Sequence, residues 1–330
     1  RSSHKNDIPT LGGITFYISL IVCMFFIQVY DIANIGFNII AALTILFIAG
    51  LKDDLVILSV RAKIFSQLLA ITFLLLNTDI HIYSLYGFLG IAEIPLWFTI
   101  GFSYFTMLSI INAYNLIDGI DGLASMLGIL MFSIFGLVFY SLQLYFYFLI
   151  CVIPIGFLVA FLRYNLSNSK KIFMGDTGSM IIGFLIGLLC LRFLSLSPMQ
   201  LEKIHIQPEN LLLLTLDIIS VPFIDTLRIV VIRFLNKKSL FKPDRNHVHH
   251  ILIDLGLSHI KSSILLTLFN VFIITLFLVL NLYLPSGSSL FMFSVTILFT
   301  MLFLFHLNRN YRDLNNEAKI KTVSVPVSYT

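Results

Sequence analysis

Five short polar motifs interrupt an otherwise strongly apolar chain, and each contains residue types that bind metal ions or phosphate groups. They are HKNDIPTLGG at 4–13, KDD at 52–54, NAYNLIDGIDG at 112–122, MGDTGSM at 174–180 and KPDRNHVHH at 242–250. Carboxylates bind Mg²⁺, amides at helix starts bind phosphate oxygens, and basic side chains offset phosphate charge. The motifs therefore predict a site for a phosphorylated substrate.

The motif at 112–122 carries Asn115, Asp118 and Asp121 at a spacing of three. On a helical turn such residues form one polar stripe, and Gly119 and Gly122 allow a ligand to approach the backbone. A single Asp-Gly pair is more typical of a solvated turn. The doubled pattern between two apolar runs instead favours a binding site.

The motif at 174–180 places Asp176 immediately before an apolar run. We expect Thr177 or Ser179 to cap the helix that follows and its first amides to bind phosphate oxygens. Mg²⁺ takes one or two carboxylates together with substrate phosphates, which makes Asp176 a candidate ligand. Simple helix capping is the alternative interpretation.

The motif at 242–250 sets His247, His249 and His250 beside Arg245. Its H-x-H-H spacing lacks the i, i+4 pairing of helical zinc sites, and the sequence places no cysteine nearby. Phosphate recognition by hydrogen bonds and positive charge is the favoured interpretation, with a solvated loop as the alternative.

Two further signals are weaker. Lys5 and Thr10 precede the first apolar run in company with a glycine pair. Asp225 and Arg228 are spaced i, i+3 within a later apolar run, where they could simply neutralise each other near the membrane.

The elements that must position these motifs are membrane helices. The chain is 58% hydrophobic and 12% charged, whereas soluble domains carry about 25% charged residues. Ten apolar runs approach the length of a bilayer crossing, and we expect helices there because helices satisfy their own backbone in lipid and the runs lack the alternation of barrel strands. The predicted spans are 14–30, 35–51, 62–77, 96–111, 123–141, 144–162, 178–196, 210–235, 264–284 and 288–307.

The predicted fold class is an all-α polytopic membrane protein with about ten transmembrane helices. Residues 1–307 are expected to form one domain, and residues 308–330 a loosely ordered cytoplasmic tail. Segment 78–95 mixes polar and apolar residues, and it predicts a short hairpin or an interfacial segment.

The charge distribution orients the chain. With ten crossings, all of the 21 Lys and Arg residues except Arg192 and Lys203 fall on the side of the N-terminus. Positive residues favour the cytoplasm, so both ends and all five motifs are predicted to be cytoplasmic. This rule does not require carboxylates at the same helix ends, and their presence there indicates a functional site.

Taken together, the motifs resemble the polyprenyl-phosphate N-acetylhexosamine-1-phosphate transferase family, glycosyltransferase family 4. The matching pieces are K-x-x-x-P-T-x-G-G from Lys5, the pair Asp53 and Asp54, N-A-x-N-x-x-D-G-x-D-G-L from Asn112, G-D-x-G-S from Gly175 and D-R-x-H-x-H-H from Asp244. The last motif is similar to the branch that uses UDP-N-acetylglucosamine, including bacterial undecaprenyl-phosphate transferases. The P-x-H-H-H pattern of the peptidoglycan branch is absent from the sequence.

The resemblance also implies a topology. Family members usually have eleven spans with the N-terminus outside. Ten predicted spans and a start at Arg1 lead us to expect that a first helix precedes this sequence.

The resemblance implies a reaction: transfer of N-acetylhexosamine 1-phosphate, expected to be that of GlcNAc, from a UDP-sugar to a polyprenyl phosphate, with release of UMP. This is a first membrane step of cell-envelope glycan synthesis, in the bacterial inner membrane. The resemblance also implies Mg²⁺ as the cofactor, with Mn²⁺ as an alternative. It implies a lipid partner and no nucleic acid partner, and it allows a homodimer. Direct attack by the lipid phosphate is favoured over a covalent enzyme intermediate.

The resemblance assigns site residues by motif. Asp53 and Asp54 would bind or deprotonate the lipid phosphate or help to hold Mg²⁺. The expected catalytic residues are Asp53, Asp54, Asp118, Asp121 and His247; the metal ligands are Asp176 and Asn115; the substrate-binding residues are Lys5, Thr10, Asn112, Asn115, Arg245, His249 and His250.

Several alternatives stay open. Another UDP-N-acetylhexosamine or UDP-MurNAc-pentapeptide could be the donor. A membrane transporter is disfavoured, because transporters place polar groups near the midplane of paired repeats and this sequence shows no repeat. A non-catalytic scaffold is disfavoured because all five motifs are intact.

Overall fold

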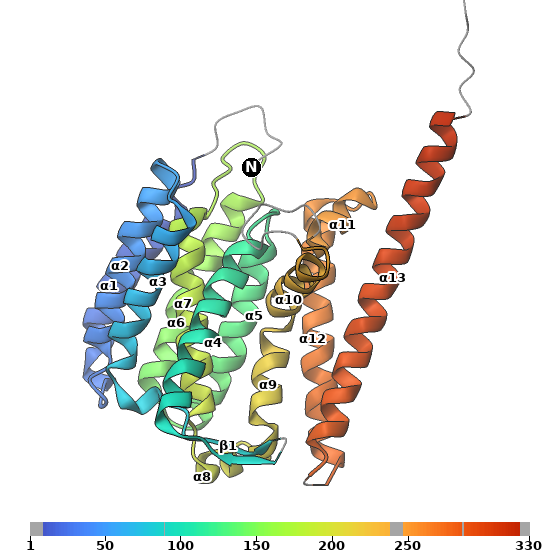
Figure 1. Ribbon diagram of the computed structural model, residues 1–330. Coiled ribbons are helices and arrows are strands. Elements are labelled where there is room, and N and C mark those ends of the chain that lie inside the picture. The colour runs from blue at the N-terminus through green and yellow to red at the C-terminus, as the bar shows by residue number, and fades with distance from the viewer. Residues whose placement is uncertain (1–8, 89, 238–246, 286, 324–330) are drawn as a thin grey trace, which may run out of the picture.

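The computed structural model describes residues 9–88, 90–237, 247–285 and 287–323, and nearly all of them are helical. Figure 1 shows the helices as a bundle of roughly parallel rods, with two short strands at one end and α13 standing to one side. The elements are α1 (Gly12–Ile27), η1 (Gln28–Tyr30), α2 (Gly36–Leu55), α3 (Val60–Leu75), η2 (Thr78–Ile80), β1 (Ser84–Phe88), β2 (Ile91–Glu93), α4 (Leu96–Ile117), α5 (Leu123–Ser141), α6 (Tyr145–Asn165), α7 (Gly175–Leu194), α8 (Pro198–Lys203), η3 (Pro208–Asn210), α9 (Leu211–Ile218), α10 (Ser220–Leu235), α11 (Val248–Asp254), α12 (His259–Tyr283) and α13 (Ser289–Val323).

Within the described residues, eight helices are long and apolar enough to cross a membrane: α1 with η1, α2, α4, α5, α6, α7, α12 and α13. Their outward faces carry strongly exposed hydrophobic side chains such as Phe25, Phe37 and Trp97. Soluble proteins rarely expose such a surface. The prediction of an all-α, multi-pass membrane protein is confirmed.

The prediction of ten uninterrupted crossings was wrong at one place. The span predicted at 62–77 is α3, a helix of 16 residues, shorter than the roughly 20 of a typical crossing, and it runs from the end of α2 to the hairpin end of the bundle (Figure 1). The span predicted at 210–235 is not one helix, because it is broken into α9 and α10 at Ile219. Figure 1 shows α10 turned away from the direction of α9.

The break at Ile219 has a local cause and a long-range support. Pro222 lacks an N–H, and its ring would clash with the carbonyl four residues earlier in a continuous helix. Asn270 of α12 satisfies the groups that the break frees. Its Nδ2 donates to the carbonyls of Asp217 and Ile218 at 3.1 and 3.2 Å, and its Oδ1 accepts from the Val221 amide at 3.4 Å.

The hairpin predicted within 78–95 is confirmed. Strands β1 and β2 pair antiparallel, with Ser84 opposite Glu93. Helix α13 continues into the predicted tail as far as Val323, in a stretch that contains neither glycine nor proline. The tail itself stays a prediction.

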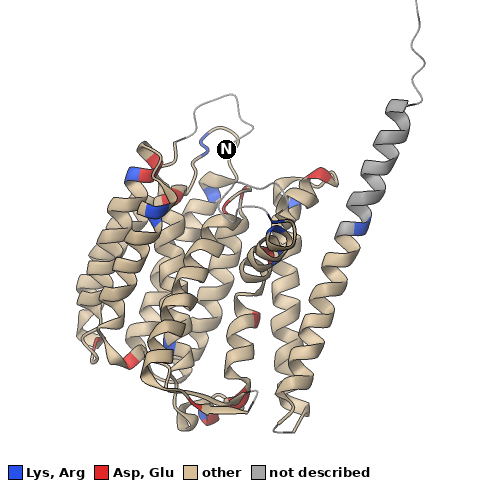
Figure 2. Ribbon diagram, in the orientation of Figure 1, with Lys and Arg blue, Asp and Glu red and all other residues tan. Residues whose placement is uncertain are grey.

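Charged side chains mark one end of the bundle. Figure 2 shows most Lys and Arg residues gathered where α2 ends and α7 begins, while the opposite end carries mainly acidic residues. We call the first of these the site end. The segregation agrees with the alternation of basic loops in the sequence, and the side of the membrane stays a prediction.

Helix α7 is the centre of the bundle. In an 18-residue window of this helix 94% of the residues are buried, as expected for a helix that is hydrophobic on all sides. It packs against α1, α2 and α4, among others. A Cβ atom at Gly183 would lie 2.9 Å from the Ile111 Cα of α4, so the small residue lets the two backbones approach closely.

This packing predicts opposite effects for two glycine substitutions. Gly183→Ala should lower the free energy of unfolding by about 1–3 kcal/mol, because the new methyl group meets backbone that cannot rotate away. Gly156→Ala in α6 should be neutral or stabilising by up to about 1 kcal/mol, since no atom of a packing neighbour in the described residues lies within 4 Å of its Cβ position. Thermal unfolding in detergent checks both, and equal shifts would contradict the close α4–α7 approach.

Candidate active site

The start of α7 is held by a carboxylate from another helix. Asp54, in the last turn of α2, accepts hydrogen bonds from the amides of Asp176 and Thr177 at 2.7 and 3.1 Å and from the Thr177 hydroxyl at 2.6 Å. Gly175 adopts φ +73°, and a Cβ atom there would lie 2.7 Å from a carboxylate oxygen of Asp54. Both the conformation and the space require glycine.

Two expectations about α7 were therefore wrong. Neither Thr177 nor Ser179 caps the helix by its side chain; within the described residues the hydroxyl of Thr177 donates to Asp54 and that of Ser179 to the Gly175 carbonyl at 3.0 Å. The amides of Asp176 and Thr177 are not open to a phosphate group, because Asp54 already occupies them. Sequence spacing could not reveal this, since the cap comes from a residue 122 positions away.

The first motif lies against the same loop. The Phe173 amide donates to the Pro9 carbonyl at 2.9 Å, and the amides of Gly12 and Gly13 donate to the carbonyls of Phe173 and Met174 at 3.2 and 3.0 Å. Thr10 is half-buried beside this pairing. The motif thus braces the loop before Asp176, while Lys5 lies outside the described residues.

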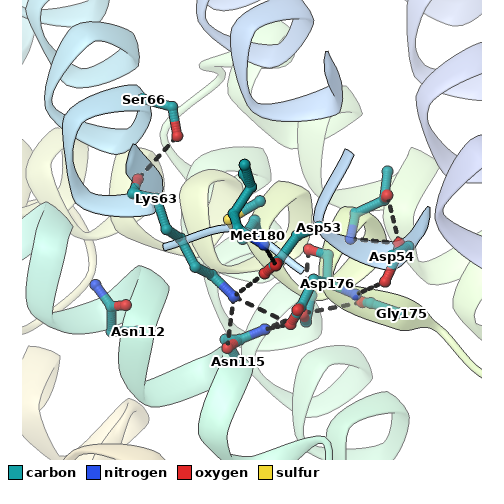
Figure 3. Close-up of polar contacts among 12 residues, drawn as sticks. Asp53, Asp54, Lys63, Ser66, Asn112, Asn115, Gly175, Asp176 and Met180 are labelled. Atoms are coloured by element: carbon teal, nitrogen blue, oxygen red, sulfur yellow. Dashed lines mark hydrogen bonds and ion pairs between the residues drawn. The ribbon is translucent and has the colours of Figure 1, made fainter. Parts of the chain in front are cut away.

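Four polar side chains meet beside the start of α7, and we call them the Lys63 cluster: Asp53, Lys63, Asn115 and Asp176. Figure 3 shows the ammonium group of Lys63 between the other three. Its Nζ lies 3.1 Å from Asp53 Oδ2, 3.1 Å from Asp176 Oδ1 and 3.3 Å from Asn115 Oδ1. The amide nitrogen of Asn115 donates to Asp176 and to Ser179. Motif residues from α2, α4 and α7 therefore meet at one cation that α3 supplies.

Sequence reasoning missed Lys63. The residue stands ten positions after Asp53, in the first turn of α3. Its signal was weak because a lysine at the start of an apolar run is also what the positive-inside rule produces.

Asn112 faces away from this cluster. Its amide exchanges hydrogen bonds with Gln67 of α3, at 2.9 and 3.4 Å, and donates to the Leu108 carbonyl. Figure 3 shows Asn112 one turn away from Asn115. The predicted contact of Asn112 with substrate stays a prediction.

Asp118 and Asp121 follow α4 and have different surroundings. Burial and then the charges of Asp176, Asp54 and Asp121 raise the pKa of Asp118 to about 8. Asp121 Oδ2 lies 2.6 Å from Lys171 Nζ and 3.0 Å from His259 Nδ1. Asp118 is therefore mostly a neutral carboxyl group at pH 7 beside the Lys63 cluster, whereas Asp121 belongs to a separate ion pair.

The histidine motif packs on the motif that contains Asp118. A Cβ atom at Gly119 would lie 2.5 Å from His249 Nε2, so the imidazole covers the backbone just after Asp118. His249 is buried, and burial together with the charge of His250 lowers its pKa to about 3. The rings of His247 and His249 stack at 5.5 Å. Arg245 lies outside the described residues.

The comparisons with known proteins agree with this convergence of motifs. The sequence model described as glycosyl transferase family 4 matches residues 36–194. The undecaprenyl-phosphate alpha-N-acetylglucosaminyl 1-phosphate transferase of Salmonella typhi is 30% identical over 277 residues, which cover 81% of this chain and 71% of that protein. The chain belongs to glycosyl transferase family 4. A Bacillus subtilis protein named "Probable undecaprenyl-phosphate N-acetylglucosaminyl 1-phosphate transferase" is 28% identical over 273 residues, covering 81% and 72%.

As a member of glycosyl transferase family 4, the protein is a transferase, and the resemblance seen in its motifs is confirmed. The family match runs from α2 to the end of α7, so it includes the whole Lys63 cluster and Asp118. The histidine motif lies beyond the matched residues. Its assignment to the site of this glycosyl transferase therefore depends on the contact between His249 and Gly119.

The buried His249 predicts a pH dependence of stability. Its folded pKa of about 3 lies below the usual value of 6.5, so below pH 6.5 the unfolded chain binds a proton that the folded chain does not. Stability should fall as the pH falls from 6.5 towards 3, by about 2 kcal/mol at pH 5. His249→Gln should remove this loss in thermal unfolding scans at pH 7.5 and 5.

His306→Gln is the control, because His306 is exposed on α13. It should keep the pH dependence of the parent. The same slope in His249→Gln as in the parent would contradict the burial of a neutral imidazole.

Proposed function

We propose that this protein transfers N-acetylglucosamine 1-phosphate from UDP-N-acetylglucosamine to undecaprenyl phosphate, forming undecaprenyl-diphospho-N-acetylglucosamine and UMP. The observation that carries the proposal is the Lys63 cluster at the end of an apolar bundle. A water-soluble donor and a lipid acceptor can meet only at the membrane surface, and the cluster lies where membrane helices end. The names of the similar proteins point to the same donor sugar and lipid.

The reaction is an exchange of phosphate partners. An oxygen of the lipid phosphate attacks the β-phosphorus of the donor, and the bond from that phosphorus to the bridging oxygen of UMP breaks. The leaving UMP retains that oxygen and its electron pair. The lipid phosphate is already ionised at neutral pH, so the step requires no base and no covalent enzyme intermediate.

The main barrier is the approach of two anions, and the Lys63 cluster fits a divalent cation. Around the ammonium group of Lys63 stand carboxylate oxygens of Asp53 and Asp176 and the amide oxygen of Asn115. These are the hard oxygen donors that Mg²⁺ prefers, completed by substrate phosphates, and Mn²⁺ accepts the same class of ligand. Asp176 and Asn115 would hold the ion, with Asp53 beside them, and the ion would supply charge neutralisation at the diphosphate.

The chain's own residues divide the remaining work. Lys63, which lies beside the residues that would hold the cation, would offset the charge of the diphosphate. Asp118 adds a carboxyl group next to the metal ligands. His247, His249 and His250, together with Arg245 and Lys5, contact the diphosphate or the sugar, and Thr10 and Asn112 support the walls of the site.

Asp54 has a different role from its neighbour Asp53. Its two carboxylate oxygens are occupied by the amides of Asp176 and Thr177 and by the Thr177 hydroxyl. A carboxylate committed to a helix start is poorly placed to take a proton from lipid phosphate. Asp54 therefore positions Asp176, and Asp53 serves the cation and the lipid phosphate.

The positive-inside rule supports a cytoplasmic location for the site end, where the water-soluble UDP-sugar would reach it. The bacterial relatives support the bacterial inner membrane as the location, with the site facing inward. The described N- and C-terminal ends of the chain then both belong to the cytoplasmic side.

The first test is a transfer assay with the protein in detergent, undecaprenyl phosphate, Mg²⁺ and labelled UDP-N-acetylglucosamine. We expect a labelled lipid that disappears with EDTA and falls by at least about 100-fold in Asp176→Asn, since that variant removes a charged ligand from the reacting phosphates. Asp79→Asn, in the exposed η2 segment at the opposite end, is the matched control and should retain activity. A protein that labels no lipid with any UDP-amino-sugar, including UDP-MurNAc-pentapeptide, would refute the proposal.

A second test should show that substitutions of the adjacent residues Asp53 and Asp54 have different effects on stability and on transfer. Asp54→Asn leaves buried donors at the start of α7 without a charged acceptor and should lower the free energy of unfolding by about 1–3 kcal/mol. Asp53→Asn should abolish transfer with little loss of stability, because it also relieves repulsion from Asp176. Thermal unfolding and transfer rates measured on both variants check this. Equal stability of the two would contradict the capping role of Asp54.

A further inference from the structure

Asp225 makes contacts that the proposed function has not used. It lies in α10, is only 4% exposed, and reaches the histidine motif with both carboxylate oxygens. Oδ2 lies 2.9 Å from His247 Nδ1, and Oδ1 accepts from the Val248 amide at 2.9 Å. The neighbour suggested by sequence spacing, Arg228, is farther away, at 3.6 Å.

These contacts act on two things at once. The Val248 amide belongs to the first residue of α11, so Asp225 fixes where that helix begins. The contact with His247 Nδ1 places a proton on that nitrogen, because a carboxylate accepts and does not donate. When Nδ1 of a neutral imidazole carries the proton, Nε2 carries none and is a hydrogen-bond acceptor.

The break between α9 and α10 sets the position of Asp225 relative to the histidine motif. Asn270 bonds both sides of the break at Ile219, so α10 leaves the line of α9 in a defined direction. Asp225, Val248 and His249 help to line a small apolar hollow between α10, α12 and α13. The Asp225 carboxylate is buried there, which favours its hydrogen bonds to the histidine motif.

We propose that Asp225 is a positioning residue: it holds His247 with Nδ1 protonated, so that Nε2 is the atom presented to the UDP-sugar. This inference rests on the proposed function in one respect, namely that His247 contacts the donor. Asp225 itself acts through His247 and the start of α11 and does not touch the reacting atoms.

Asp225→Asn is the informative variant. Its amide oxygen can still accept from the Val248 amide, while its NH₂ group can donate to His247 Nδ1 and so reverse the tautomer. We expect kcat for transfer to fall by about 10- to 100-fold, as when an outer partner of a functional histidine is lost. Thermal stability should stay near that of the parent, because both hydrogen bonds have replacements. Asp217→Asn, on the neighbouring helix α9 and equally buried, is the control and should keep the parent's kcat.

A double-mutant cycle with His247→Gln separates positioning from general support. If Asp225 acts through His247, then Asp225→Asn in the His247→Gln background should change kcat by less than about twofold. Effects that multiply, or a loss of activity that follows a loss of thermal stability, would overturn the proposal.

The tautomer can be read without any substrate. In protein with ¹⁵N-labelled histidine, the His247 signals, identified by their absence in His247→Gln, should show Nδ1 protonated in the parent and Nε2 protonated in Asp225→Asn. Nε2 protonation in the parent would overturn the proposal. A parent that makes no lipid product would refute the proposed function alone, because this spectroscopic result depends only on Asp225 and His247.

Discussion

The first backbone amides of α7 must find acceptors inside the protein, because this helix begins among packed helices at a membrane surface. Asp54 supplies the acceptors from α2. That one carboxylate fixes the relative height of α2 and α7. The same contact brings Asp53, next to Asp54 on α2, close to Asp176 at the start of α7. The pairing of residues 9–13 with the loop at 173–174 closes the same junction from outside.

The junction between α2 and α7 brings several carboxyl groups close together, and their negative charges repel one another. Burial and the charges of Asp176 and Asp54 raise the pKa of Asp118 to about 8, while Lys63 pairs with both Asp53 and Asp176. The charge of Lys63 offsets the repulsion between Asp53 and Asp176 and so keeps the two carboxylates together.

The site joins two parts of the chain that are far apart in sequence. The packing of His249 on Gly119 brings the histidine motif to the end of α4, and Asp225 holds that motif through His247 and Val248. Asp225 can do so because α10 is broken away from α9. A helix that ran straight from Leu211 to Leu235 would carry its polar residues along the bundle axis instead.

Hydropathy and residue type are local, and so the sequence by itself determined the membrane helices, the hairpin, the family motifs and the end of the bundle at which they lie. Pro222 was a local sign of the break at Ile219, but the continuous hydropathy of residues 210–235 predicted a single helix there. Only the tertiary structure decided which donor each polar group meets. Asp54 caps α7, Lys63 lies between Asp53 and Asp176, and Asp225 lies closer to His247 than to Arg228. These partners depend on how closely and at what height distant helices pack, and no spacing along one helix contains that information.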